Sequence, residues 1–156
     1  MTSHAGLYSL RRDLKIKIYH QRRNFAQPST CPICGEEITI EGGADMHEVF
    51  FTRGDVQGIH DENTHHLIYH PCNVALVHHG DCHLKAQHTE DGKRKCAELI
   101  IKWEGEPNVS RYIDQMARVV KNNLEAVQLL GYVHGLSIQL TGDLPTVKQT
   151  PVWDFD

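Results

Sequence analysis

The chain reads NVALVHHGDCHLKAQH from residue 73 to residue 88. The part up to Val77 is apolar and rich in β-branched residues, which is typical of a buried strand. The Gly80-Asp81 pair marks a turn, and a helix is predicted to begin at Cys82. The stretch therefore predicts a strand that leads through a histidine-rich turn into a helix.

A second strand is predicted upstream. Residues 31–35 read CPICG, a tight turn, and residues 44–52 read ADMHEVFFT, whose apolar and aromatic residues favour a strand. Residues 54–63 contain two glycines and several acidic side chains and predict an irregular loop. The order of turn, strand, loop, strand and helix predicts a small α+β fold.

Further helices are predicted on both sides of this core. Apolar residues recur at helical spacing over residues 7–23, Lys95–Glu104 and Ser110–Leu130. The first of these helices is basic, and Gly131 is expected to stop the last. The chain is then expected to divide into a basic helical arm with a linker, a core, two C-terminal helices and a mobile tail, at residues 1–30, 31–93, 94–131 and 132–156.

The size and composition narrow the class of protein. The 156 residues suit one ordinary domain, and no run of about 20 apolar residues could span a membrane. The first residues lack the apolar segment of a signal peptide. Five cysteines fit metal ligands or free thiols in a reducing compartment better than a disulfide framework. We therefore expect a soluble, cytoplasmic protein.

Charge and histidine are distributed unevenly. The net charge is −4, but residues 1–30 carry six Lys or Arg against one Asp, and residues 31–90 carry two against ten Asp or Glu. Nine of the twelve histidines lie between His47 and His88, and such crowding is typical of metal and proton-transfer sites. The basic arm is expected to contact phosphates through Arg11, Arg12, Lys15, Lys17, Arg22 and Arg23.

A structural zinc site is predicted from two ligand pairs of equal spacing. Cys31 and Cys34 form a CxxC knuckle, and two thiolates alone do not complete a tetrahedral site. His79 and Cys82 supply a second pair at the same spacing, with His78 as the alternative to His79. The predicted zinc ligands are therefore Cys31, Cys34, His79 and Cys82. The other two cysteines, Cys72 and Cys96, are expected to be small buried apolar residues.

The same residues give the chain a resemblance to a known family. The CPIC turn, the segment DMHEVFFTR, the segment NVALV and the Cys82-His83 pair occur in the order found in HNH nucleases, over residues 31–90. The resemblance implies a ββα-metal core, stapled by zinc, that hydrolyses DNA with the help of one divalent cation such as Mg²⁺ or Mn²⁺. It implies that His47 is the general base, that Asn73 ties the loop and orients this histidine, and that His83 binds the catalytic cation.

The chain departs from the family pattern beside the general base. Many family members have a metal-binding Asp or His directly before that residue, whereas this chain has Met46, which is no ligand for a hard cation. Strand alternation places Asp45 on the same face as His47, so Asp45 is the favoured replacement. Glu48 and His88 remain alternatives as the residue that completes the cation site.

Three functions are therefore weighed. The leading hypothesis is a metal-dependent HNH DNA endonuclease, encoded by a phage and acting in the host cytoplasm. The first alternative is a zinc-stabilised module that binds nucleic acid without efficient catalysis, and Met46 gives it some support. The second is a protein-interaction scaffold, whose partner would contact the C-terminal helix or the tail.

Overall fold

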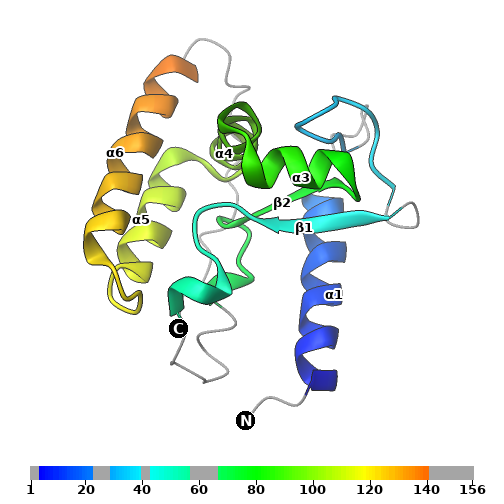
Figure 1. Ribbon diagram of the computed structural model, residues 1–156, viewed down its shortest axis with the longest axis horizontal. Coiled ribbons are helices and arrows are strands. Elements are labelled where there is room, and N and C mark those ends of the chain that lie inside the picture. Colours follow the sequence, from blue (N-terminus) through cyan, green and yellow to red (C-terminus); the bar gives the residue numbers. More distant parts are fainter. Residues whose placement is uncertain (1–3, 23–28, 40–42, 57–66, 141–156) are drawn as a thin grey trace.

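A computed structural model describes residues 4–22, 29–39, 43–56 and 67–140 (Figure 1). Five α-helices, one 3₁₀ helix and two strands are assigned within these ranges. In chain order they are α1 (His4–Gln21), β1 (Ala44–Glu48), the 3₁₀ helix η2 (Arg53–Val56), β2 (Val74–His78), α3 (Asp81–His88), α4 (Glu90–Glu104), α5 (Glu106–Met116) and α6 (Asn123–Leu140). The predicted α+β class is confirmed.

The two strands form an antiparallel hairpin that α3 directly follows. Ala44 pairs with His78 at one end, and Glu48 pairs with Val74 at the other. Both α3 and α1 contact the hairpin, and Figure 1 shows them on opposite sides of it. The first strand is shorter than residues 44–52, because Phe50 and Phe51 donate their backbone N–H groups to the Asn73 side chain instead of to a neighbouring strand.

Two clusters of buried side chains hold the elements together. The first joins the hairpin, α1, α3 and part of α4 and includes Ile18, Ile38, Val74, Val77 and Cys96. The second joins α4, α5 and α6 to the segment after β1 and includes Phe51, Ile68, Ile100, Tyr112 and Val133. Met46 packs against both clusters, so this residue fills space between the two parts of the core. The expectation that Cys72 and Cys96 are buried is confirmed, since neither is exposed to solvent.

The corner between α3 and α4 depends on two residues. The Thr89 hydroxyl accepts a hydrogen bond from the N–H group of Gly92 at 2.9 Å and donates one to the Lys85 carbonyl at 2.7 Å, so it caps α4 and ends α3. A Cβ atom on Gly92 would lie 2.2 Å from that same carbonyl oxygen. Only glycine therefore fits where the two helices meet.

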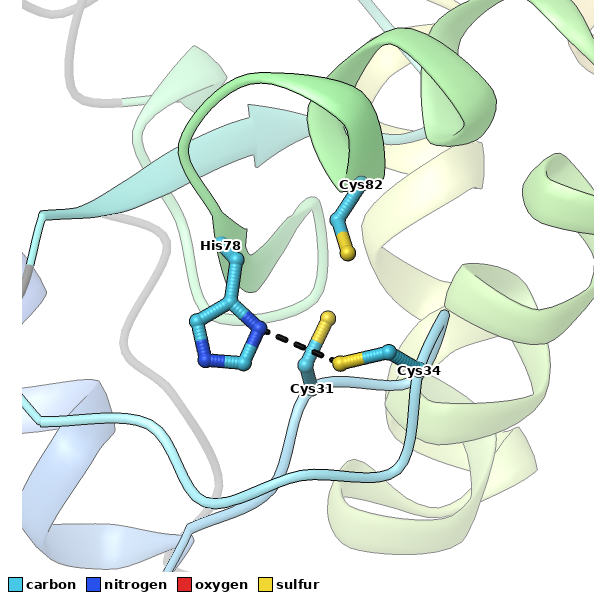
Figure 2. Close-up of side chains that lie close together, drawn as sticks. All are labelled: Cys31, Cys34, His78 and Cys82. Carbon is cyan, nitrogen blue, oxygen red and sulfur yellow. Dashed lines mark hydrogen bonds between the residues drawn. The ribbon is translucent and has the colours of Figure 1, made fainter.

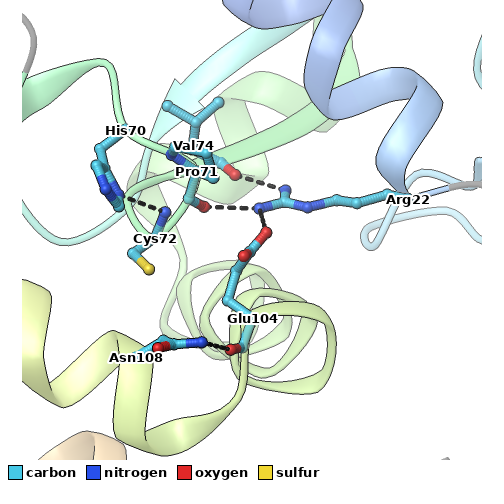
Figure 3. Close-up of polar contacts among 7 residues, drawn as sticks. All are labelled: Arg22, His70, Pro71, Cys72, Val74, Glu104 and Asn108. Carbon is cyan, nitrogen blue, oxygen red and sulfur yellow. Dashed lines mark hydrogen bonds and ion pairs between the residues drawn. The ribbon is translucent and has the colours of Figure 1, made fainter. Parts of the chain in front are cut away.

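A buried arginine joins the end of α1 to the rest of the molecule (Figure 3). Arg22 donates to the carbonyl groups of Val74 at 2.6 Å and Pro71 at 2.7 Å, and its guanidinium lies 3.3 Å from the Glu104 carboxylate at the end of α4. The Arg22 and Glu104 side chains are 4% and 3% exposed. The expectation that Arg22 contacts phosphate is therefore wrong, because this arginine compensates a buried carboxylate.

The predicted C-terminal helices differ from the observed ones in their boundaries. The segment predicted as one helix over Ser110–Leu130 is divided into α5 and α6, and α6 continues through Gly131 to Leu140. Val133 and Leu136 pack in the core beyond the expected end, and this burial outweighs the low helix propensity of Gly131. The segment boundaries predicted at residues 93 and 131 fall inside α4 and α6. Residues 141–156 of the expected tail lie outside the described residues.

No helix in the described part of the chain combines the length and the apolar character needed to span a membrane.

Candidate metal and histidine site

Four side chains from three separate elements converge beside the hairpin (Figure 2). Cys31 and Cys34 come from the CPICG turn, His78 is the last residue of β2, and Cys82 lies in the first turn of α3. One donor atom from each of these residues lies within 4.8 Å of the others, and the Cys34 sulfur is 3.2 Å from Nδ1 of His78. Three cysteines and one histidine at this spacing could hold a zinc ion in tetrahedral coordination.

The local backbone positions the two turn cysteines. Gly35 has a φ of +78°, which favours glycine, and its N–H group donates to the Cys31 carbonyl at 2.8 Å. The Cys31 N–H group donates to the Glu36 carbonyl at 2.9 Å, and Thr30 pairs with Glu37 in an isolated bridge. These bonds close the turn so that both sulfur atoms reach the same point.

The fourth member of the cluster is His78, so the choice of His79 as the zinc ligand is corrected. His78 ends β2, and its Nε2 atom donates to the Glu37 carbonyl at 3.0 Å, which leaves Nδ1 directed to Cys34. His79 follows it and turns away, with its Nδ1 atom 2.9 Å from Asp45. Adjacent residues at the end of a strand point to opposite sides, and equal CxxC-like spacing could not reveal which one faces the cysteines.

The electrostatics of the cluster favour a cation. Burial, together with the neighbouring Cys31 and Cys34, raises the pKa of the Cys82 thiol to about 12. Burial also opposes ionisation of Cys31, but hydrogen bonds from the backbone of His78, Cys34 and Ile33 lower the pKa of that thiol overall. Several thiolates in one place repel one another, and a divalent cation removes this cost by binding all of them. The donor set therefore fits zinc.

A second group of polar side chains lies on the other side of the turn, between β1 and α3. Asp45 accepts hydrogen bonds from Nδ1 of His79 at 2.9 Å and from Nδ1 of His83 at 2.8 Å. The ring of His47 lies edge-to-face against the ring of His83, with 5.2 Å between their centroids. Strand alternation correctly places Asp45 and His47 on one face, and the structure adds His79, which the sequence interpretation had assigned to zinc.

Burial determines the charge of His47. The side chain is 7% exposed, and burial together with the nearby His83 lowers the pKa of His47 to about 4. The imidazole is therefore neutral near pH 7 and can accept a proton. The hydrogen bonds from His79 and His83 outweigh the effect of burial on Asp45 and lower the pKa of its carboxyl group, so that group is ionised at the same pH.

Asn73 is completely buried and holds the chain after β1 in place. Its side-chain oxygen accepts hydrogen bonds from the N–H groups of Phe50 at 2.8 Å and Phe51 at 2.9 Å. Its amide nitrogen donates to the carbonyls of Phe51 at 2.8 Å and Ile68 at 3.0 Å. Asn73 thus ties the segment that follows His47 to the start of β2, while its effect on the orientation of His47 stays a prediction.

The other candidates for a cation site lie elsewhere. Glu48 follows His47 on the other face of β1 and also reaches the wall of the cavity that His47 lines. Its charge adds to the burial that raises the pKa of Tyr112 in the second buried cluster. His88 is exposed at the last position of α3, ~140° around the helix from His83. Three further histidines of the cluster, His60, His65 and His66, lie outside the described residues, as does the side chain of Arg53.

The described side chains supply only part of a binding site for a catalytic cation. Within the described ranges, the cysteine cluster is the one group in which three or more donor atoms come within 4.8 Å of one another. Asp45 and His83 share a hydrogen bond of 2.8 Å between Oδ2 and Nδ1, so the atoms left to bind a cation such as Mg²⁺ or Mn²⁺ are Nε2 of His83 and the other carboxylate oxygen of Asp45. These two side chains would hold such a cation, with substrate and water completing its coordination.

The sequence interpretation missed two features of this region. It did not identify the cavity beside His47, which is lined by residues from β1, α3, α4 and α6, because no local pattern connects these elements. It also gave Arg22 to the basic arm, because no signal in the sequence marks Glu104 as the buried acid that pairs with this arginine. Comparison of the chain with protein-family models, with curated proteins and with solved structures finds no match.

Proposed function

We propose that the protein is a metal-dependent DNA endonuclease of the HNH type. The observation that carries this proposal is the group formed by Asp45, His47 and His83 on a strand–strand–helix unit beside a Cys₃His cluster. A neutral buried imidazole, an ionised carboxylate and a second histidine can supply a general base and hold a cation for phosphodiester hydrolysis. The order and spacing that resemble HNH nucleases support the same activity.

In the proposed mechanism His47 acts on water. A ring nitrogen of the neutral His47 accepts a proton from the water that attacks the scissile phosphodiester. Asp45 holds the proton on Nδ1 of His83, so the Nε2 atom of His83 remains available as a ligand. A bound Mg²⁺ or Mn²⁺ would stabilise negative charge on the phosphate and on the leaving 3′-oxygen. Asn73 keeps the backbone beside His47 fixed during these steps.

A plasmid-nicking assay tests the proposal. The wild-type protein should convert supercoiled plasmid to the nicked form with Mg²⁺ or Mn²⁺ and should not do so in a chelator that leaves structural zinc bound. His47→Ala should reduce the nicking rate by about 10²–10⁴-fold, the usual contribution of a general base. His134→Ala, an exposed histidine on α6, is the matched control and should keep the wild-type rate. Equal nicking by His47→Ala and the control would refute the assignment.

The second candidate is an interaction module, which one observation favours. The side of α6 away from the core exposes Leu124, Val127 and Ile138 at 60–65%. Such a face is typical of a contact with another protein. A protein that shows no nicking with any divalent cation, but binds a partner through this face, would support the module instead.

The cellular setting follows from the nuclease proposal. A small HNH nuclease of this kind would be phage-encoded and would act on DNA in the host cytoplasm. The helix α1 would contribute non-specific affinity, because Arg12 and Lys17 are exposed, whereas Arg22 is not available. Each phosphate contact contributes roughly one unit to the logarithmic salt dependence of binding.

A further inference from the structure

A cavity lies directly beside the proposed general base. It has a volume of about 320 Å³, and His47 forms part of its wall. The remaining wall comes from Glu48 at the end of β1, from the segment after β1, from α3 and α4, and from α6. Binding sites for small organic groups in proteins begin at roughly this volume. A group held here would therefore contact the proposed reaction centre.

The wall of the cavity is suited to an uncharged group. Val49, Ala86, Ala97 and Leu129 supply apolar surface. The ammonium group of Lys93 lies 3.7 Å from the carboxylate of Glu90, so these opposite charges compensate each other. Glu48 adds a second carboxylate to the wall, so a phosphate would be repelled there and would find no uncompensated cation among the lining residues.

Two polar side chains in the wall of the cavity can orient a bound group. Tyr132 on α6 is 42% exposed and presents an aromatic ring that can stack on a planar partner. Gln87 near the end of α3 is exposed, and its amide can both donate and accept hydrogen bonds. An apolar wall, an aromatic ring and an amide match the face and the edge of a nucleobase.

We infer that this cavity binds a nucleobase of the DNA strand whose phosphodiester lies at His47, with the base stacked on Tyr132 and its edge facing Gln87. The inference rests on the proposed nuclease function and deepens it. A base inside a duplex must leave its stack to enter the cavity, at a cost of a few kcal/mol, whereas an unpaired base avoids this cost. The substrate class is therefore DNA with an unpaired nucleotide next to the scissile bond.

Cleavage kinetics provide the first test. Stacking of a base on an aromatic side chain is worth ~1–3 kcal/mol, so Tyr132→Ala should raise KM on a single-stranded oligonucleotide by about 5–150-fold. Tyr132→Phe, which keeps the ring, should remain within about twofold of the wild type. Gln139→Ala is the control, at an exposed position of α6 outside the cavity, and should leave KM unchanged. The wild type should also cleave a duplex with one unpaired nucleotide faster than the fully paired duplex.

A binding experiment that needs no cleavage provides the second test. Deoxyadenosine should shift the backbone amide resonances of Gln87 and Tyr132 in the NMR spectrum of the full chain, and inorganic phosphate should not. Gln87→Leu, at an exposed position, should weaken this binding without affecting the fold. Wild-type protein that does not nick DNA but binds deoxyadenosine would contradict the proposed function alone. Nicking with an unchanged KM in Tyr132→Ala, or no nucleoside-dependent shifts, would overturn the cavity assignment.

Discussion

The Oδ2 atom of Asp45 lies 2.8 Å from Nδ1 of His83, which couples the first strand of the hairpin to the helix that follows it. An ionised carboxylate can only accept here, so the bond fixes the proton of His83 on Nδ1 and leaves Nε2 as a donor atom for a metal. Met46 lies where the resemblance to HNH nucleases implies a metal ligand, and it packs between the two halves of the core. The carboxylate that meets the helix histidine therefore comes from the residue before Met46.

If the protein is the proposed nuclease, Asp45→Asn should weaken the binding of the catalytic cation and leave the fold intact. The amide keeps the shape of the side chain but loses the negative charge, and changes of this kind reduce metal affinity by about 10–100-fold. We expect the Mn²⁺ concentration for half-maximal nicking to rise by this factor, with partial recovery at high Mn²⁺. Asp114→Asn, an exposed aspartate on α5, is the control. A thermal midpoint that falls sharply in Asp45→Asn alone would instead assign Asp45 a structural role.

The second prediction separates two adjacent histidines. His78→Ala removes a member of the Cys₃His cluster, whereas His79→Ala removes a partner of Asp45. Structural zinc contributes roughly 10 kcal/mol or more of apparent binding energy, so His78→Ala should lose zinc and most of its thermal stability. His79→Ala should keep one equivalent of zinc and a near wild-type melting temperature. Zinc analysis and thermal unfolding provide the measurements, and loss of zinc only in His79→Ala would restore the original ligand choice.

The sequence predicts the elements of this site better than their contacts. Both strands, α3 and the CxxC turn follow from local composition and turn residues, and each is found near its expected position. The choice between His78 and His79 depends on how β2 ends and on the carbonyl of Glu37, which lies 41 residues away in the chain. Residue spacing alone carries no information on such a contact.

The absence of long-range information in residue spacing also explains two wrong predictions, one at Arg22 after α1 and one at Gly131 in α6. Arg22 looks like one more cation of a basic helix until Glu104, 82 positions later, is found buried beside it. Gly131 is a stop signal by propensity, but the tertiary packing of Val133 and Leu136 continues α6 past it. In both cases a long-range contact outweighs a local preference.

The third prediction concerns the buried ion pair. Removal of one partner leaves the other charged and buried, so Arg22→Ala should lower the free energy of unfolding by about 3–5 kcal/mol. The double variant Arg22→Met with Glu104→Gln should recover part of this loss, because no uncompensated charge remains. Arg94→Ala breaks an exposed pair with Asp91 and should cost at most about 1 kcal/mol. Urea unfolding of the four proteins measures these differences, and equal losses for Arg22→Ala and Arg94→Ala would contradict the assigned role.

The last prediction uses the pH dependence of stability. His70 is 7% exposed, its ring stacks on Tyr112 with 4.7 Å between centroids, and its Nδ1 atom accepts a hydrogen bond from the Cys72 N–H group at 3.0 Å (Figure 3). Burial, together with the charge of Lys17, lowers the pKa of His70 to about 4, against about 6.5 for the unfolded chain. Below pH 6.5 the unfolded chain binds a proton that the folded protein excludes, so this contribution to stability falls as the pH decreases towards 4.

At pH 5 the loss from this one group amounts to about 2 kcal/mol relative to pH 7.5. His70→Gln lacks the titrating group, so the difference in unfolding free energy between the wild type and the variant should shrink by this amount over the same interval. Taking the difference removes the contributions of the cysteine cluster and of His47, because both proteins share them. Urea unfolding at several pH values provides the measurement. A difference that stays constant from pH 7.5 to pH 5 would mean that His70 takes up its proton in the folded protein as readily as in the unfolded chain.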